Sequence, residues 1–115
     1  MARTYSKKVR KLLREFWREA YERELHSELT KLDEGFSEWR EGRISSGELS
    51  HRIHRYETGP SRKLYKTYND GERDLMVASA IVSGILDRDE VPDVLLEALA
   101  GPINFWASME DDQGA

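Results

Sequence analysis

The chain contains no cysteine and only three prolines in its 115 residues. The lack of cysteine excludes disulfide bonds, thiolate metal ligands and a cysteine nucleophile. No apolar run approaches the roughly 20 residues needed to span a bilayer, so we expect no transmembrane helix. Hydrophobic residues make up only 38% of the chain, which predicts a single domain, residues 1–115, with a small core.

The start of the chain has no apolar segment after its basic residues, unlike a secretory signal peptide. We therefore expect a soluble, cytoplasmic protein. The first few residues and the acidic residues 110–115 are expected to be frayed, because chain ends without apolar contacts are rarely held in place.

The net charge of −4 hides a strong segregation of acidic and basic residues. Residues 1–20 carry +5, residues 21–41 carry −4, residues 42–73 carry +3 and residues 74–115 carry −8. Two interpretations remain open. The basic segments can bind an acidic partner, or they can be neutralised by the acidic C-terminal third within one molecule.

The first third of the sequence has the pattern of one long amphipathic helix over residues 5–41, with apolar residues every three or four positions. Thr4 or Ser6 can cap its start, and Gly42 can end it. Such a helix is about 55 Å long at 1.5 Å per residue, whereas a compact domain of this size has a radius of gyration near 13 Å. The helix therefore either bends at Gly35 or projects and needs a partner.

The remainder of the chain also has helical patterns, separated by glycine and proline. The expected helices cover residues 46–57, 60–69, 72–87 and 89–100, with a short apolar patch after Gly101-Pro102. The segment 72–87 is apolar nearly all round, which is typical of a buried central helix. The predicted fold class is all-α, a compact bundle of five or six helices.

The candidates for catalysis and metal binding are few, and we predict neither a catalytic site nor a cofactor. Glu48 and His51 have the Glu-x-x-His spacing of carboxylate-bridged metal bundles, but such sites need a second motif and further carboxylates. The weak metal candidates are Glu22, His26, Glu48, His51 and His54. A metal-dependent helical enzyme is therefore the third of our functional hypotheses.

A nucleic-acid-binding regulator is the second hypothesis. Helices 46–57 and 60–69, joined by a turn at residues 58–59, have the lengths of a helix-turn-helix. The side chains expected to contact nucleic acid are Arg52, Arg55, Arg62, Lys63, Lys66 and Asn69, aided by the basic N-terminal helix face. Many such helix pairs bind nothing, and the acidic net charge opposes this interpretation.

The leading hypothesis is a non-enzymatic interaction or assembly module that forms a homo-oligomer through the long first helix. It depends on apolar surface that one copy cannot bury. The interface candidates are Tyr5, Leu13, Trp17, Tyr21, Phe105 and Trp106. A membrane partner is not expected, because the same helix becomes acidic after residue 21.

Overall fold

The structure, a computed structural model, describes the backbone of residues 4–114 and the side chains of residues 4–110. Every regular element in this part of the chain is helical, which confirms the all-α class. The elements are α1 (Lys7–Arg40), α2 (Ser46–Tyr56), η1 (Glu57–Ser61), α3 (Arg62–Asp70), α4 (Arg73–Ser83), η2 (Arg88–Glu90), α5 (Asp93–Ala98) and α6 (Ala100–Gly114).

The long first helix is present and continues through Gly35 without a break. The Ser6 hydroxyl accepts a hydrogen bond from the Val9 N–H at the start of α1. Gly42 follows its end with a φ of 78°, a conformation that glycine adopts at little cost. The helix projects instead of bending. As a result the molecule measures 53 × 36 × 28 Å and its radius of gyration is 17.6 Å, so the expected compact bundle is wrong.

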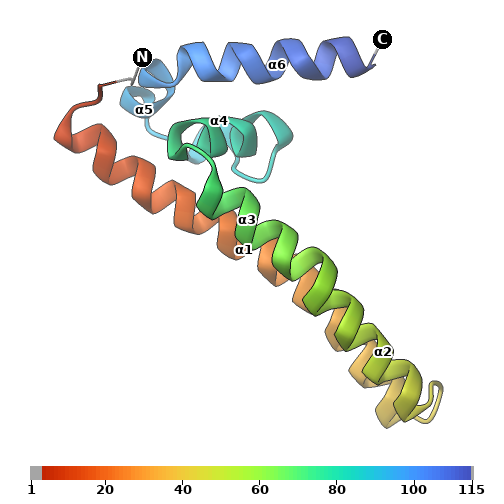
Figure 1. The fold of residues 1–115 in the computed structure, drawn as a ribbon. Helices are drawn as coiled ribbons and strands as arrows, with labels where there is room; N and C mark the ends of the chain where they lie inside the picture. The colour runs from red at the N-terminus through yellow and green to blue at the C-terminus, as the bar shows by residue number, and fades with distance from the viewer. Residues whose placement is uncertain (1–3, 115) are drawn as a thin grey trace.

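The return path along α1 is one nearly straight helical rod made of α2, η1 and α3 (Figure 1). The predicted turn at residues 58–59 is therefore wrong. Tyr56, Ser61 and Arg62 all have right-handed helical φ and ψ angles, and Pro60 lies within the π-helical turn η1. A proline ring clashes with the carbonyl four residues earlier in an α-helix, and a wider π-turn relieves that clash. The chain thus passes a Gly-Pro pair without changing direction.

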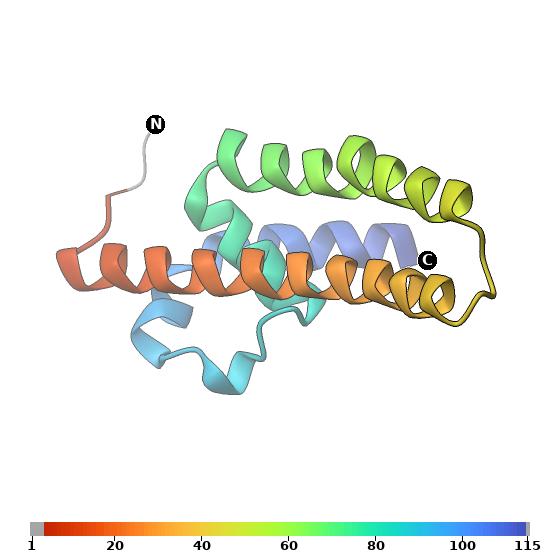
Figure 2. The same cartoon turned by 90° about the horizontal axis from the view of Figure 1, so that it is seen from below.

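The molecule divides into two regions (Figure 1). We call residues 22–67 the arm; it contains the second half of α1, all of α2 and η1, and most of α3. We call residues 4–21 and 68–114 the head. In the head, α4 packs on both α1 and α6, and α5 packs on α1. Figure 2 shows α2 and α3 along one side of α1, with η2 and α5 along the other.

The head contains the hydrophobic core. Its fully buried side chains include Val77 on α4, Leu86 after α4, and Leu95 and Leu99 around α5. The predicted central helix is thus present and buried, but it ends at Ser83 instead of residue 87. Gly84 ends it, with a φ of 85° and an N–H that donates to the Ile81 carbonyl.

The C-terminal elements differ from the prediction in two ways. Gly101 and Pro102 do not end a helix; they lie in the first turn of α6, where proline is tolerated because its missing N–H has no helical partner. The short apolar patch expected after Gly101-Pro102 is instead part of α6, which continues to Gly114. The first residues of the chain and residue 115 lie outside the described part.

An aromatic cluster joins the arm to the head. Trp17 Nε1–H donates to the Tyr68 carbonyl at 2.9 Å, and the Tyr21 and Tyr68 rings stack with their centroids 4.9 Å apart. Arg73 covers the Trp17 ring at 4.9 Å. Burial and a hydrogen bond with Glu24 raise the pKa of the Tyr68 hydroxyl. These contacts fix α3 and the start of α4 against α1.

Candidate functional site

One side of the arm carries large apolar side chains that residues 4–110 leave exposed. Leu29 and Trp39 on α1 are 47% and 41% exposed, Ile53 on α2 is 39% exposed, and Tyr65 on α3 is 61% exposed. Single exposed apolar residues are ordinary on protein surfaces, whereas contiguous ones mark interaction sites. The relative placement of these four residues therefore decides how they should be interpreted.

Two pairs of contacts define the sides of the arm. At its centre, a Cβ added to Gly35 would meet Arg52 and Leu49 at ordinary contact distances. On one side of this contact, Arg52 forms an ion pair with Glu38 at 3.2 Å. On the other side, Trp39 Nε1–H donates to the Ser46 hydroxyl at 3.0 Å.

The helical period assigns the exposed residues to these sides. Leu29 lies about 120° around α1 from Gly35, in the direction opposite to Glu38, at 100° per residue. Ile53 is displaced from Leu49 in the direction opposite to Arg52, and Tyr65 is displaced in the same sense from the buried Tyr68. All four exposed residues therefore lie on the Trp39–Ser46 side.

On α1 the apolar residues of this side follow a heptad pattern. Leu25, Leu29, Leu32, Phe36 and Trp39 are spaced alternately by four and three residues, which is the spacing of a coiled-coil seam. We call these five residues, together with Ile53 and Tyr65, the arm stripe. Because α2 packs over Gly35, at the edge of the seam instead of its centre, the stripe is only partly covered.

The arm also has a polar surface, which shares Leu32 with the arm stripe. It contains an open cleft of about 400 Å³ beside the π-helical turn. Its lining residues are Glu28, Lys31, Leu32, Arg52, Arg55, Tyr56 and Pro60. Lys31 forms an ion pair with Glu28, and Arg52 forms ion pairs with Glu38 and Glu48. The basic groups of this cleft are thus largely engaged by neighbouring carboxylates.

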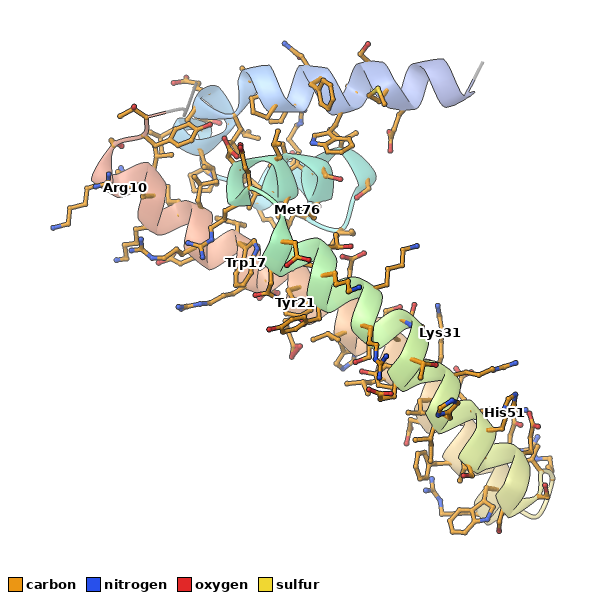
Figure 3. The ribbon with its side chains drawn as sticks, in the orientation of Figure 1. Arg10, Trp17, Tyr21, Lys31, His51 and Met76 are labelled. Atoms are coloured by element: carbon orange, nitrogen blue, oxygen red, sulfur yellow. The ribbon has the colours of Figure 1, made fainter. Side chains whose placement is uncertain are left out.

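The weak metal candidates do not come together. Glu22, His26, Glu48, His51 and His54 are all exposed, on the outer surfaces of α1 and α2 (Figure 3 labels His51). Within residues 4–110, no group of three or more histidine or carboxylate side chains is arranged to hold a metal ion. The Glu48 carboxylate instead accepts a hydrogen bond from Arg52.

The predicted nucleic-acid residues lie along a straight helical rod instead of a helix-turn-helix. Arg62 pairs with Glu57, and the Asn69 side-chain amide donates to the Tyr65 carbonyl at 2.8 Å. Arg52 is held by its two carboxylates. Of the basic residues in the predicted set, only Arg55, Lys63 and Lys66 are exposed without an ion pair to a residue in the described part of the chain.

Most of the predicted interface residues serve the fold of a single copy. Leu13 is buried in the head, so its assignment to an interface is wrong. The Tyr5 hydroxyl donates to the Asp74 carboxylate at 2.8 Å, and Trp106 Nε1–H donates to the Leu75 carbonyl at 3.0 Å. Trp17 and Tyr21 belong to the aromatic cluster. Of the six, only Phe105, at 53%, is an exposed side chain.

The arm stripe was missed as a site, although its signal is visible in the sequence. The heptad spacing from Leu25 to Trp39 coincides with the helical period of the long first helix, on which a self-association surface was predicted, but at other residues. Which of its residues remain exposed depends on where α2 crosses α1, and the one-dimensional pattern does not contain that information.

Comparison of the chain with protein-family models, with curated proteins and with solved structures found no match. In the described part of the chain, no helix combines the length and the apolar character needed to cross a membrane.

Proposed function

We propose that the protein is a non-enzymatic interaction module that self-associates through the arm stripe. The observation that carries the proposal is the row of four exposed apolar side chains along one side of the arm. Two helices bury only the surfaces that face each other, and a stable helical domain covers its remaining apolar faces with further helices. No segment in the described part of the chain covers this face of the arm.

A second copy is the occupant that fits this face best. Two arms paired through their arm stripes form a four-helix bundle, a common architecture for helices of this length. Two helices about 10 Å wide and about 30 Å long present a face on the order of 600 Å². This area is close to the ~800 Å² that each partner buries in a standard interface.

The charges at the edges of the stripe are complementary under a two-fold axis parallel to the arm. By helical position, the α1 edge carries Glu22 and Asp33, and the α3 edge carries Arg62 and Lys66. Such an axis sets α1 of one copy against α2 and α3 of the other. It therefore brings Glu22 of each copy to the level of Arg62 and Lys66 of its partner, which favours this pairing.

Sedimentation velocity of the wild-type chain and of two matched variants tests the proposal. The wild type is expected to sediment as a dimer of 13.4 kDa chains at high micromolar concentration. Leu29→Glu places a charge in the stripe and should weaken association at least tenfold, because an unpaired charge in an apolar interface is costly.

Thr30→Glu is the control, since it adds the same charge at the neighbouring, outward-facing position. It should leave association unchanged. The proposal fails if the wild type is monomeric at all concentrations, or if both variants weaken association equally. Circular dichroism of each variant at low concentration verifies that the monomer is still folded.

A further inference from the structure

A second surface, in the head, is defined by charge instead of by apolar side chains. Five exposed basic residues cover one face of the first half of α1, and a sixth, at the start of α4, lies beside them. We call this set the basic face: Lys7, Arg10, Lys11, Arg14, Arg18 and Arg73. Figure 3 shows side-chain nitrogens gathered along this outer part of α1, around Arg10.

These cations converge on one surface. The five residues on α1 fall within an arc of about 100° and extend over about 16 Å at 1.5 Å per residue. Arg10, Arg14 and Arg73 line one shallow pocket of about 320 Å³, together with Tyr5, Leu13, Glu72 and Asp74. Arg73 is held in place by the Trp17 ring.

The basic face keeps an excess of positive charge, since its pocket is lined by only two carboxylates, Glu72 and Asp74, among the described residues. None of its six side chains forms an ion pair with a carboxylate of residues 4–110. The expected cancellation by the acidic C-terminal third meets a geometric obstacle. Arg23 extends to Glu90 in the η2 segment, and Arg14 lies nine residues before Arg23. Nine residues are two and a half turns, so the acidic η2 segment lies across α1 from the basic face.

We infer that the basic face binds the phosphate backbone of a double-stranded nucleic acid. Binding to phosphates needs only exposed cations and is independent of base sequence. A protein partner would need apolar or aromatic anchors, and a membrane-surface helix would need an apolar face to insert. Between residues 4 and 28 no large hydrophobic side chain is exposed. The same fact disfavours single strands, which bind by stacking on exposed aromatic rings.

Fluorescence anisotropy of a labelled 20-base-pair DNA duplex, titrated with the full chain at 50 and 200 mM salt, tests the inference. If each of the five basic-face residues on α1 contacts one phosphate, the affinity should fall about 500-fold between these salt concentrations. The triple variant Lys11→Ala, Arg14→Ala, Arg18→Ala should bind more weakly at 50 mM. Its affinity should fall only about tenfold with salt, since about two phosphate contacts remain.

A second triple variant, Arg55→Ala, Lys63→Ala, Lys66→Ala, is the matched control. It removes the same charge from exposed positions of α2 and α3, and it should retain the wild-type salt dependence. An RNA duplex should bind within a few-fold of DNA, because phosphates alone are contacted, and a single strand of equal length should bind more weakly.

Several results would overturn the inference. They are the absence of duplex binding at 50 mM, an equal loss in both triple variants, or a loss confined to the α2 and α3 variant. Binding to anionic lipid vesicles without binding to duplex would also overturn it. Because the Lys11, Arg14 and Arg18 variant lies outside the arm stripe and its charged edges, its outcome is separate from the test of self-association.

Discussion

The head and the arm are built from the same kind of helix but are held together in different ways. Among the described residues, every buried apolar side chain except Leu49 lies in the head. The arm instead relies on the Ser45 cap of α2, on the packing of Leu49 and Arg52 over Gly35, and on surface ion pairs. Exposed ion pairs contribute little stability. Apolar burial therefore stabilises mainly the head, whereas the arm gains little stability from its own contacts.

The largest expected effect is a loss of stability in the head. Leu99→Ala removes a side chain that is fully buried beside α5, and the resulting cavity should lower the free energy of unfolding by about 2–5 kcal/mol. The same truncation in the arm, Leu29→Ala, should cost less than about 1 kcal/mol in the monomer, because the side chain is 47% exposed. Urea unfolding at low concentration measures both. Similar losses of unfolding free energy in Leu99→Ala and Leu29→Ala would contradict the difference between the head and the arm.

Replacing a glycine of the head that has a positive φ should lower the free energy of unfolding. Gly84 ends α4 with a φ of 85°, a conformation that costs an L-residue about 1–2 kcal/mol. Gly84→Ala should therefore reduce the free energy of unfolding by roughly that amount, although nothing lies within 4 Å of the added methyl group. An unchanged urea midpoint would show that the left-handed turn is not required.

A glycine-to-alanine substitution in the arm should instead raise the free energy of unfolding. Gly35 lies within α1, and an added Cβ would meet Arg52 and Leu49 at 3.5–3.6 Å, which is ordinary contact. Gly35→Ala should stabilise the monomer by about 0.5–1 kcal/mol through its higher helix propensity. The measurement is again the urea midpoint at low concentration. A loss of stability would mean that the two helices of the arm are in closer contact than these distances indicate.

The smallest effect is a pH dependence at the junction of α1 with η2. Hydrogen bonds from Arg23 and from the Asp87 N–H lower the pKa of Glu90. A carboxylate with a depressed pKa stabilises the fold above its ordinary pKa, and this contribution is lost as the pH falls through the depressed value. Glu90→Gln should therefore lower the thermal midpoint at pH 7. If the thermal midpoint of Glu90→Gln stayed below that of the wild type by the same amount down to pH 2, the lowered pKa of Glu90 would not be its cause.

Local sequence signals predicted the long first helix well. The apolar period and the Ser6 and Gly42 signals predicted α1 almost to the residue, because helix period and capping are determined by near neighbours. The Gly59-Pro60 pair was misread for the same reason. A π-turn accommodates the proline, and α1 packs against this turn as well as against α2 and α3 on either side of it.

The candidate sites depended on contacts between distant segments and were predicted less well. Trp17 and Tyr21 are paired with Tyr68, about fifty residues away, so an apolar residue on the first helix was not evidence of a free surface. The basic N-terminal face was predicted as a candidate surface. Its lysines and arginines, Lys7, Lys8, Arg10, Lys11, Arg14 and Arg18, are all exposed in the structure.

The central claim is that a second copy completes the arm but not the head. Amide hydrogen exchange at low and high protein concentration tests it most directly, because it reports on each region separately. The account predicts that exchange in residues 25–39 and 46–65 slows as the concentration rises, while exchange in α4 and α5 does not change. Exchange in the arm that is independent of concentration would contradict the account.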